Sequence, residues 1–228
     1  MRALVRLFLI IFPFMLFSCE ESGESNPDLG FGFQPLEVGL FWEYEVDQTI
    51  TFGEDDSETE KFFLRERVEY FYTNAQNEIV YVVKRERSSD RRFWIGLGNY
   101  AMQYRGNRLL RMEENQTVIA LIFPPTKGRT WDAMGFNASE PDFFEIEDVG
   151  IGSVGAFSFP STVRVKQEQD DDLITFRDNR YEVYARGVGL IEQYYEVLTY
   201  CSRVDCLGQQ LVDSGRKTHL KLLDYGRR

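Results

Sequence analysis

The alternation that decides the fold is plainest in Trp42-Glu43-Tyr44-Glu45-Val46-Asp47, where apolar side chains hold the even positions and acidic side chains the odd ones. Successive side chains of a β-strand point to opposite faces of a sheet, so this pattern predicts a strand with one buried and one solvated face. The same period of two recurs along most of the chain. We therefore expect a core that is covered by strands.

The next apolar set along the chain consists of Phe62, Leu64, Val68 and Tyr70. We expect these side chains to share one face of a strand, although Glu66 interrupts the pattern. Further strands are separated by turn residues, of which Gly106-Asn107 and Asp178-Asn179 have the chemistry of tight turns. The predicted strands are 42–47, 62–72, 78–87, 100–105, 108–112, 117–123, 143–149, 161–169, 173–177, 180–186, 190–199, 209–213 and 217–225.

The fold class follows from the number and spacing of these segments. No window of a dozen residues has helical periodicity, and Tyr, Phe, Trp and Val are abundant. About a dozen short strands with polar turns indicate an antiparallel meander. We predict an all-β protein with a single antiparallel domain over residues 35–228, for which an open half-barrel is one form.

The N-terminal residues have the features of a targeting signal. Arg2 and Arg6 lie before an uncharged apolar run of eleven residues, 7–17. Ser18 follows this run and stands directly before Cys19. This order is typical of a secretory signal peptide and resembles a bacterial lipobox. The run is shorter than the roughly 20 residues of a membrane-spanning helix. We predict a lipoprotein signal peptide over residues 1–18, cleavage before Cys19, and palmitate-type acyl chains on Cys19; the alternative is an ordinary secreted protein.

Residues 19–34 are predicted to be the lipidated cysteine and a flexible acidic tether, because residues 20–28 are acidic and lack apolar side chains. Acidic residues after the cysteine resemble the export signal of Bacteroidota surface lipoproteins; a solvated spacer is the other interpretation. We expect a lipid-anchored domain at the outer membrane, on its periplasmic or cell-surface side. The net charge of −11, which becomes −13 without the two arginines of residues 1–18, argues against nucleic acid as a partner.

Two cysteines remain, Cys201 and Cys206, and an exported domain lies where disulfides persist. We predict a disulfide between them. The alternative, half of a metal site, lacks further ligands, since His219 is the only histidine. His219 lies between Thr218 and Leu220 and is expected to face solvent, so no catalytic residue, metal site or cofactor is assigned.

Two acidic runs, Glu54-Asp55-Asp56 and Asp170-Asp171-Asp172, could bind Ca²⁺ together with loop carbonyls. Neither has the spacing of a calcium-binding loop, and both lie between predicted strands. We expect both to be solvated turns.

Three segments carry a resemblance to a family: PLEVGLFWEY (35–44), FPPTKGRTW (123–131) and YARGVGLIEQYYEV (184–197). They are similar to landmarks of uncharacterised Bacteroidota membrane lipoproteins. The first two share G-x-x-W, with Trp42 and Trp131, which predicts a turn glycine that leads into an aromatic plug at the end of a sheet. Some such families adopt a half-barrel like the carrier LolA, which implies an apolar concave face and a lipid ligand.

The function expected from these observations is a non-catalytic binding or structural module of the cell envelope, displayed at the outer membrane. Its partners would be the membrane, through the lipid anchor, and a hydrophobic ligand or an envelope protein. The alternative is a LolA-like half-barrel that binds a lipid or another hydrophobic ligand. A carboxylate-based hydrolase is the third hypothesis, because acidic residues are numerous.

Overall fold

The computed structural model describes residues 28–54 and 56–228, so Cys19 and the predicted signal peptide lie outside the described residues. Within that part of the chain, no helix has the length and apolar character needed to cross a bilayer. The described helix is the 3₁₀ turn η1 (Phe31–Phe33). The strands are β1 (Leu40–Gly53), β2 (Asp56–Thr73), β3 (Ile79–Ser88), β4 (Ile95–Arg105), β5 (Arg108–Glu113), β6 (Gln116–Ile122), β7 (Thr130–Asp132), β8 (Phe143–Val154), β9 (Phe157–Asp171), β10 (Phe176–Ala185), β11 (Gly189–Tyr200) and β12 (Val212–Arg227).

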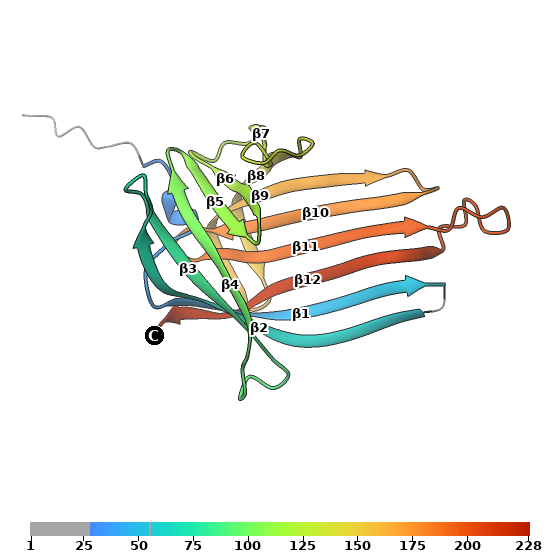
Figure 1. Ribbon diagram of the computed structural model, residues 1–228, viewed down its shortest axis with the longest axis horizontal. Helices are drawn as coiled ribbons and strands as arrows, with labels where there is room; N and C mark the ends of the chain where they lie inside the picture. The colour runs from blue at the N-terminus through green and yellow to red at the C-terminus, as the bar shows by residue number, and fades with distance from the viewer. Residues whose placement is uncertain (1–27, 55) are drawn as a thin grey trace, which may run out of the picture.

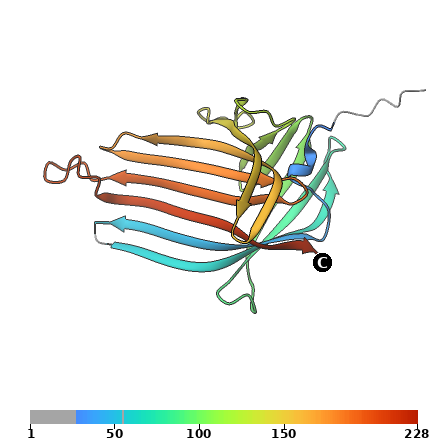
Figure 2. The same cartoon turned by 180° about the vertical axis from the view of Figure 1, so that it is seen from behind.

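All these strands belong to one antiparallel sheet, which confirms the all-β prediction. Their order is β6-β5-β4-β3-β2-β1-β12-β11-β10-β9-β8-β7, so two meanders are joined where β1 pairs with β12. Figures 1 and 2 show the sheet curling on itself, with β9 to β12, β1 and β2 extending well beyond the shorter strands.

The two edge strands, β6 and β7, meet at a seam formed by individual hydrogen bonds. The backbone N–H of Ile119 donates to the Ala133 carbonyl at 2.9 Å, and the indole Nε1 of Trp131 donates to the Ile119 carbonyl at 2.7 Å. The Asn137 amide donates to the carbonyl of Thr117 at 2.8 Å and accepts from its N–H at 2.9 Å. The sheet therefore curls nearly to closure at this end, further than a half-barrel.

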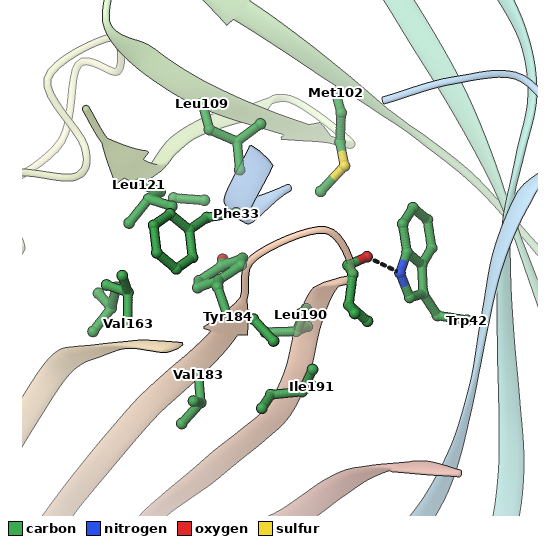
Figure 3. Packing of buried hydrophobic residues seen from close by; sticks show 14 of the residues in the cluster. Phe33, Trp42, Met102, Leu109, Leu121, Val163, Val183, Tyr184, Leu190 and Ile191 are labelled. Carbon is green, nitrogen blue, oxygen red and sulfur yellow. Dashed lines mark hydrogen bonds between the residues drawn. The ribbon is translucent and has the colours of Figure 1, made fainter. Parts of the chain in front are cut away.

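Part of the hydrophobic core lies at the closed end (Figure 3). Phe33 from η1 is 2 % exposed and packs with Leu109, Leu121 and Tyr184. The Gly187 N–H donates to the Gly32 carbonyl at 2.7 Å, which ties this segment to the β10–β11 turn. Residues 28–34 thus belong to the domain, and the predicted tether boundary at residue 34 is wrong because the apolar Phe31 and Phe33 pack against the sheet.

Gln34 and Trp42 converge on the β10–β11 turn. The Gln34 Oε1 atom accepts the Leu190 N–H at 3.0 Å, and the Tyr44 hydroxyl donates to the Leu190 carbonyl at 3.1 Å. Gly189 has φ +115°, and a Cβ there would lie 2.9 Å from Gln34 Oε1. Only glycine fits between these side chains.

The predicted glycine turns before the two tryptophans are present. Gly39 has φ +92° and Gly128 has φ +80°, values that favour glycine. Trp42 is buried at the closed end, whereas Trp131 is half-buried at the seam. In both copies the indole donates to a backbone carbonyl of another segment, Val188 for Trp42 and Ile119 for Trp131.

Two local predictions are wrong. Asp178 and Asn179 lie inside β10, while the turn forms at Asp172, whose Oδ1 accepts the N–H groups of Ile174 and Thr175 at 2.8 and 2.6 Å. The predicted strands 209–213 and 217–225 overlap one strand, β12.

Tyr70 does not share the face of Val68. Val68 pairs with Val83 but Tyr70 pairs with Val82, because Glu69 is an extra residue in β2 at that point. Such a bulge moves the following side chains to the other face of the sheet. Val68 is fully buried, whereas Tyr70 is 49 % exposed.

Candidate functional site: the mouth pocket

A cavity of about 770 Å³ lies on the concave face of the sheet. We call it the mouth pocket. It is lined by inward side chains of both meanders, including Leu64 of β2, Arg111 of β5, Gln167 of β9 and Leu220 of β12. Because β2, β9 and β12 run beyond the shorter strands, they supply part of its wall (Figure 1).

The apolar part of the lining continues from the core. Leu64, Leu190 and Leu220 are each 8 % exposed and belong to the core cluster. Val46 is 1 % exposed and packs in the same cluster. These positions follow from the alternation of β1, β2 and β12, which sends every second side chain inward.

The first polar part of the wall is built around Glu182 of β10, which is completely buried. Its Oε1 accepts hydrogen bonds from Arg111 NH2 and from Gln193 Nε2, both at 2.7 Å. Its Oε2 accepts the hydroxyl of Tyr184. Burial raises the pKa of the Tyr184 phenol well above its usual value, and the adjacent Glu182 carboxylate raises it further.

Arg111 stays charged in this setting. Burial, the largest single influence, disfavours its charge, but the Glu182 carboxylate and the neighbouring Tyr184 and Tyr100 together outweigh burial and raise the pKa of Arg111 above its ordinary value. The side chain retains 17 % exposure. Arg111 Nε and NH1 have no hydrogen-bond partner among the described residues and are not fully buried, so these donors remain available to the cavity.

The second polar part of the wall repeats this arrangement around Glu66 of β2. Its Oε1 accepts from Arg85 Nε at 3.0 Å, and its Oε2 accepts from the Tyr100 hydroxyl at 2.9 Å. Arg85 NH1 reaches Glu113 Oε1 at 2.6 Å. In both places one carboxylate oxygen binds a guanidinium and the other a tyrosine hydroxyl, which fixes the arginine at the wall.

Gln167 differs from the other polar residues of the lining. It is 7 % exposed and lies at a bulge of β9, opposite Arg180 and Tyr181. Among the described residues, its side-chain amide has no hydrogen-bond partner. Within the same residues, Arg67 Nε is the single fully buried side-chain N or O atom without a partner. The Gln167 amide also has no partner, so its atoms are not fully buried and retain contact with the cavity.

His219 lies on the outer face, because its neighbours Thr218 and Leu220 point into the pocket. Its Nε2 is 2.7 Å from Glu192 Oε1, and its ring meets Tyr194 edge-on at 5.3 Å. His219 was expected to face solvent. It does lie on the outer face, but it is half-buried there because it packs against Tyr194, its cross-strand partner on β11.

The acidic runs do not form a metal centre in the described residues, where no group of three or more His, Cys, Asp or Glu side chains could hold an ion. Asp172 closes the β9–β10 turn, and its backbone and Thr175 hydrogen bonds hold its pKa well below the usual range. Asp55 lies outside the described residues.

Cys201 and Cys206 are joined by a disulfide, with their Cα atoms 5.9 Å apart. Both cysteines are buried, and the Cys201 N–H donates to the Leu211 carbonyl at 2.8 Å. The bond closes the loop between β11 and β12.

Comparison with solved structures finds similar folds of low identity. One is an exported protein with a YmcC-like fold, so described, from Bacteroides fragilis: it is 12 % identical, has a TM-score of 0.43, and covers 86 % of this chain and 99 % of its own. Another, from Parabacteroides distasonis, is described as a lipoprotein: it is 10 % identical, has a TM-score of 0.39, and covers 85 % and 98 %. The sequence matches no protein-family model and no curated protein.

Proposed function

We propose that this chain is a cell-envelope lipoprotein, anchored at the outer membrane through Cys19, that acts as a non-catalytic binding module. The mouth pocket is its binding site, and its ligand is polar. The observation that carries the proposal is the pair of buried carboxylates, Glu66 and Glu182, that hold Arg85 and Arg111 at the cavity wall.

This arrangement costs stability. A buried ion pair is often no better for folding than well-packed apolar residues of similar volume, because both charges lose their hydration. Glu182 is completely buried, and Glu66 is 6 % exposed. Two such pairs at one cavity are better accounted for by ligand recognition than by the strength of the core.

The same contacts leave Glu66 and Glu182 unsuited to act as a catalytic acid or base. Both oxygens of Glu66 and both oxygens of Glu182 already accept hydrogen bonds from an arginine and a tyrosine. A glycosidase-type mechanism requires one carboxyl group as acid and another as base or nucleophile, each with access to the substrate. The carboxylates that are held here serve instead to orient donors.

The lining imposes a cost on an acyl chain that a polar ligand does not meet. Each buried CH₂ stabilises binding by about 0.8 kcal/mol. An acyl chain in this cavity would cover the guanidinium groups of Arg85 and Arg111 without replacing their contacts with water, a loss of about 1–3 kcal/mol for each buried unpaired group.

The proposal is tested by native mass spectrometry of the full-length protein purified from its own membrane. We expect a retained, non-covalent polar compound. Thr218→Trp, which places an indole in the pocket, should abolish retention. Lys217→Trp changes the neighbouring residue on the outer face and should retain the compound. A retained fatty acid, or equal results for the two variants, would contradict the proposal.

A further inference from the structure

We infer that the mouth pocket binds a neutral, hydroxyl-rich ligand, a short oligosaccharide, and that the Gln167 amide makes direct hydrogen bonds to it. This inference rests on the proposed binding function and names the class of ligand.

The charges of the site nearly balance. Four arginines and four acids line the cavity, namely Arg85, Arg111, Arg180, Arg216, Glu66, Glu113, Glu114 and Asp142. Glu182, which is buried behind Arg111, is a fifth acid. A pocket selective for an anion or a cation has an excess of the opposite sign, because unscreened like charges repel the ligand. The balance here favours a ligand without net charge.

Both donors and acceptors line the cavity. Arg111 keeps Nε and NH1 available, since only its NH2 binds Glu182. Glu113 uses Oε1 for Arg85, and Asp142 uses Oδ2 for Arg180, so each carboxylate has its other oxygen available as an acceptor. A hydroxyl group both donates and accepts. Adjacent hydroxyls of a sugar therefore match guanidinium and carboxylate groups with one chemical function.

Gln167 is an independent observation that points to a ligand. Its side chain is more than nine-tenths buried, faces the cavity, and has no hydrogen-bond partner among the described residues. Its amide atoms are not fully buried, so they are open to the cavity and can bind a ligand there in place of water. An amide supplies one acceptor and two donors, which again suits hydroxyl groups.

Tyr195 is the most exposed aromatic side chain of the lining, at 37 %. Phe144 is 3 % exposed, and the Arg87 guanidinium lies over the Phe62 ring, 4.0 Å from its centroid. The Tyr195 ring can pack against an apolar C–H face of a sugar while the polar groups bind its hydroxyls. The volume of about 770 Å³ lies in the range of cavities that bury most of an organic ligand.

The test is isothermal titration calorimetry on the full-length protein in detergent, with maltotetraose, cellotetraose, laminaritetraose, mannotetraose and N-acetylchitotetraose as separate probes. At least one should bind saturably. Gln167→Leu should lower its affinity about ten-fold or more, because a bidentate amide contact is lost. The melting temperature should stay equal or rise, since the amide has no partner within the protein. Gln169→Leu, an exposed position on the same strand, should bind like the wild type.

Failure of the inference is distinguishable from failure of the proposed function. Two further probes are titrated in parallel: dodecanoate, which represents an acyl chain, and the peptide Ala-Gly-Ser-Gly, which represents a polar ligand that is not a sugar. If none of the five sugars saturates but the peptide does, with loss in Gln167→Leu, the pocket binds a polar ligand and the oligosaccharide assignment is wrong. If a sugar binds equally to Gln167→Leu and the wild type, the role of Gln167 is wrong. If no probe binds and no compound is retained on purification, both proposals fall.

Discussion

The indole Nε1 of Trp42 donates a 2.6 Å hydrogen bond to the carbonyl oxygen of Val188, which lies 146 residues later in the chain (Figure 3). The bond joins the start of β1 to the turn between β10 and β11. It therefore connects the two meanders at the closed end of the sheet.

Trp42→Phe should destabilise the protein by about 2–3 kcal/mol, because it leaves the buried Val188 carbonyl unpaired and removes ring volume from the core. Urea unfolding followed by far-UV circular dichroism measures this loss. Trp94→Phe is the matched control, since Trp94 is half-buried on the outer face and makes no hydrogen bond among the described residues. Equal losses in the two variants would show that the hydrogen bond contributes little.

Gly189→Ala should cost more stability than Gly187→Ala. Both glycines have positive φ, so each alanine meets a backbone cost of about 1–2 kcal/mol. At position 189 the new Cβ would also lie 2.9 Å from Gln34 Oε1 and 3.1 Å from Trp42 Nε1, whereas at position 187 nothing lies within 4 Å. Thermal unfolding of both variants checks the difference, and a smaller effect at 189 than at 187 would count against the packing described.

Acid should weaken the outer-face cluster around Glu192. The hydrogen bond from His219 holds the pKa of the Glu192 carboxyl below its ordinary value of 4.5. A carboxyl with a lowered folded-state pKa stabilises the protein above its unfolded-state pKa, and that contribution is lost as the pH falls through the folded-state value. The stability difference between the wild type and Glu192→Gln should therefore shrink as the pH falls below the ordinary carboxyl pKa of 4.5 and through the lowered folded-state value. Chemical unfolding at several pH values measures it, and a difference that is constant with pH would refute the linkage.

Cys19→Ala should abolish palmitate labelling and release the protein from the membrane fraction or block its processing. Two acyl chains give stable anchoring, and the variant has none. Metabolic labelling followed by fractionation tests this, with Cys201→Ser as the control because that cysteine lies in the folded domain. A variant that labels and fractionates like the wild type would disprove the lipoprotein assignment.

Most of the strand content was predictable because alternation is local. The inward positions of Val46 and Leu64 follow from the period of two alone. The bulge at Glu69 was not predictable, since the extra residue shows only against the register of β3. Asp172 and Asp178 have similar turn chemistry in the sequence, and the backbone amides that converge on Asp172 decide between them.

The candidate site was less predictable, because its residues come together only through strand pairing. Arg111 and Glu182 are 71 residues apart, and their contact depends on how the two meanders face each other. One signal was present: Glu66 stands in an otherwise apolar inward face between Leu64 and Val68. A charged residue at such a position is a candidate for a buried pair.

The place of β12 in the sheet has a consequence for biogenesis. β12 pairs with β1 on one side and β11 on the other. It therefore joins the meander that is synthesised first to the meander that is synthesised later. A chain that leaves a ribosome or an export channel N-terminus first holds two unjoined meanders until β12 has emerged. Pairing between such distant segments is slow and comes late in folding. We therefore expect the pairing of β12 with β1 to form after the hairpins within each meander.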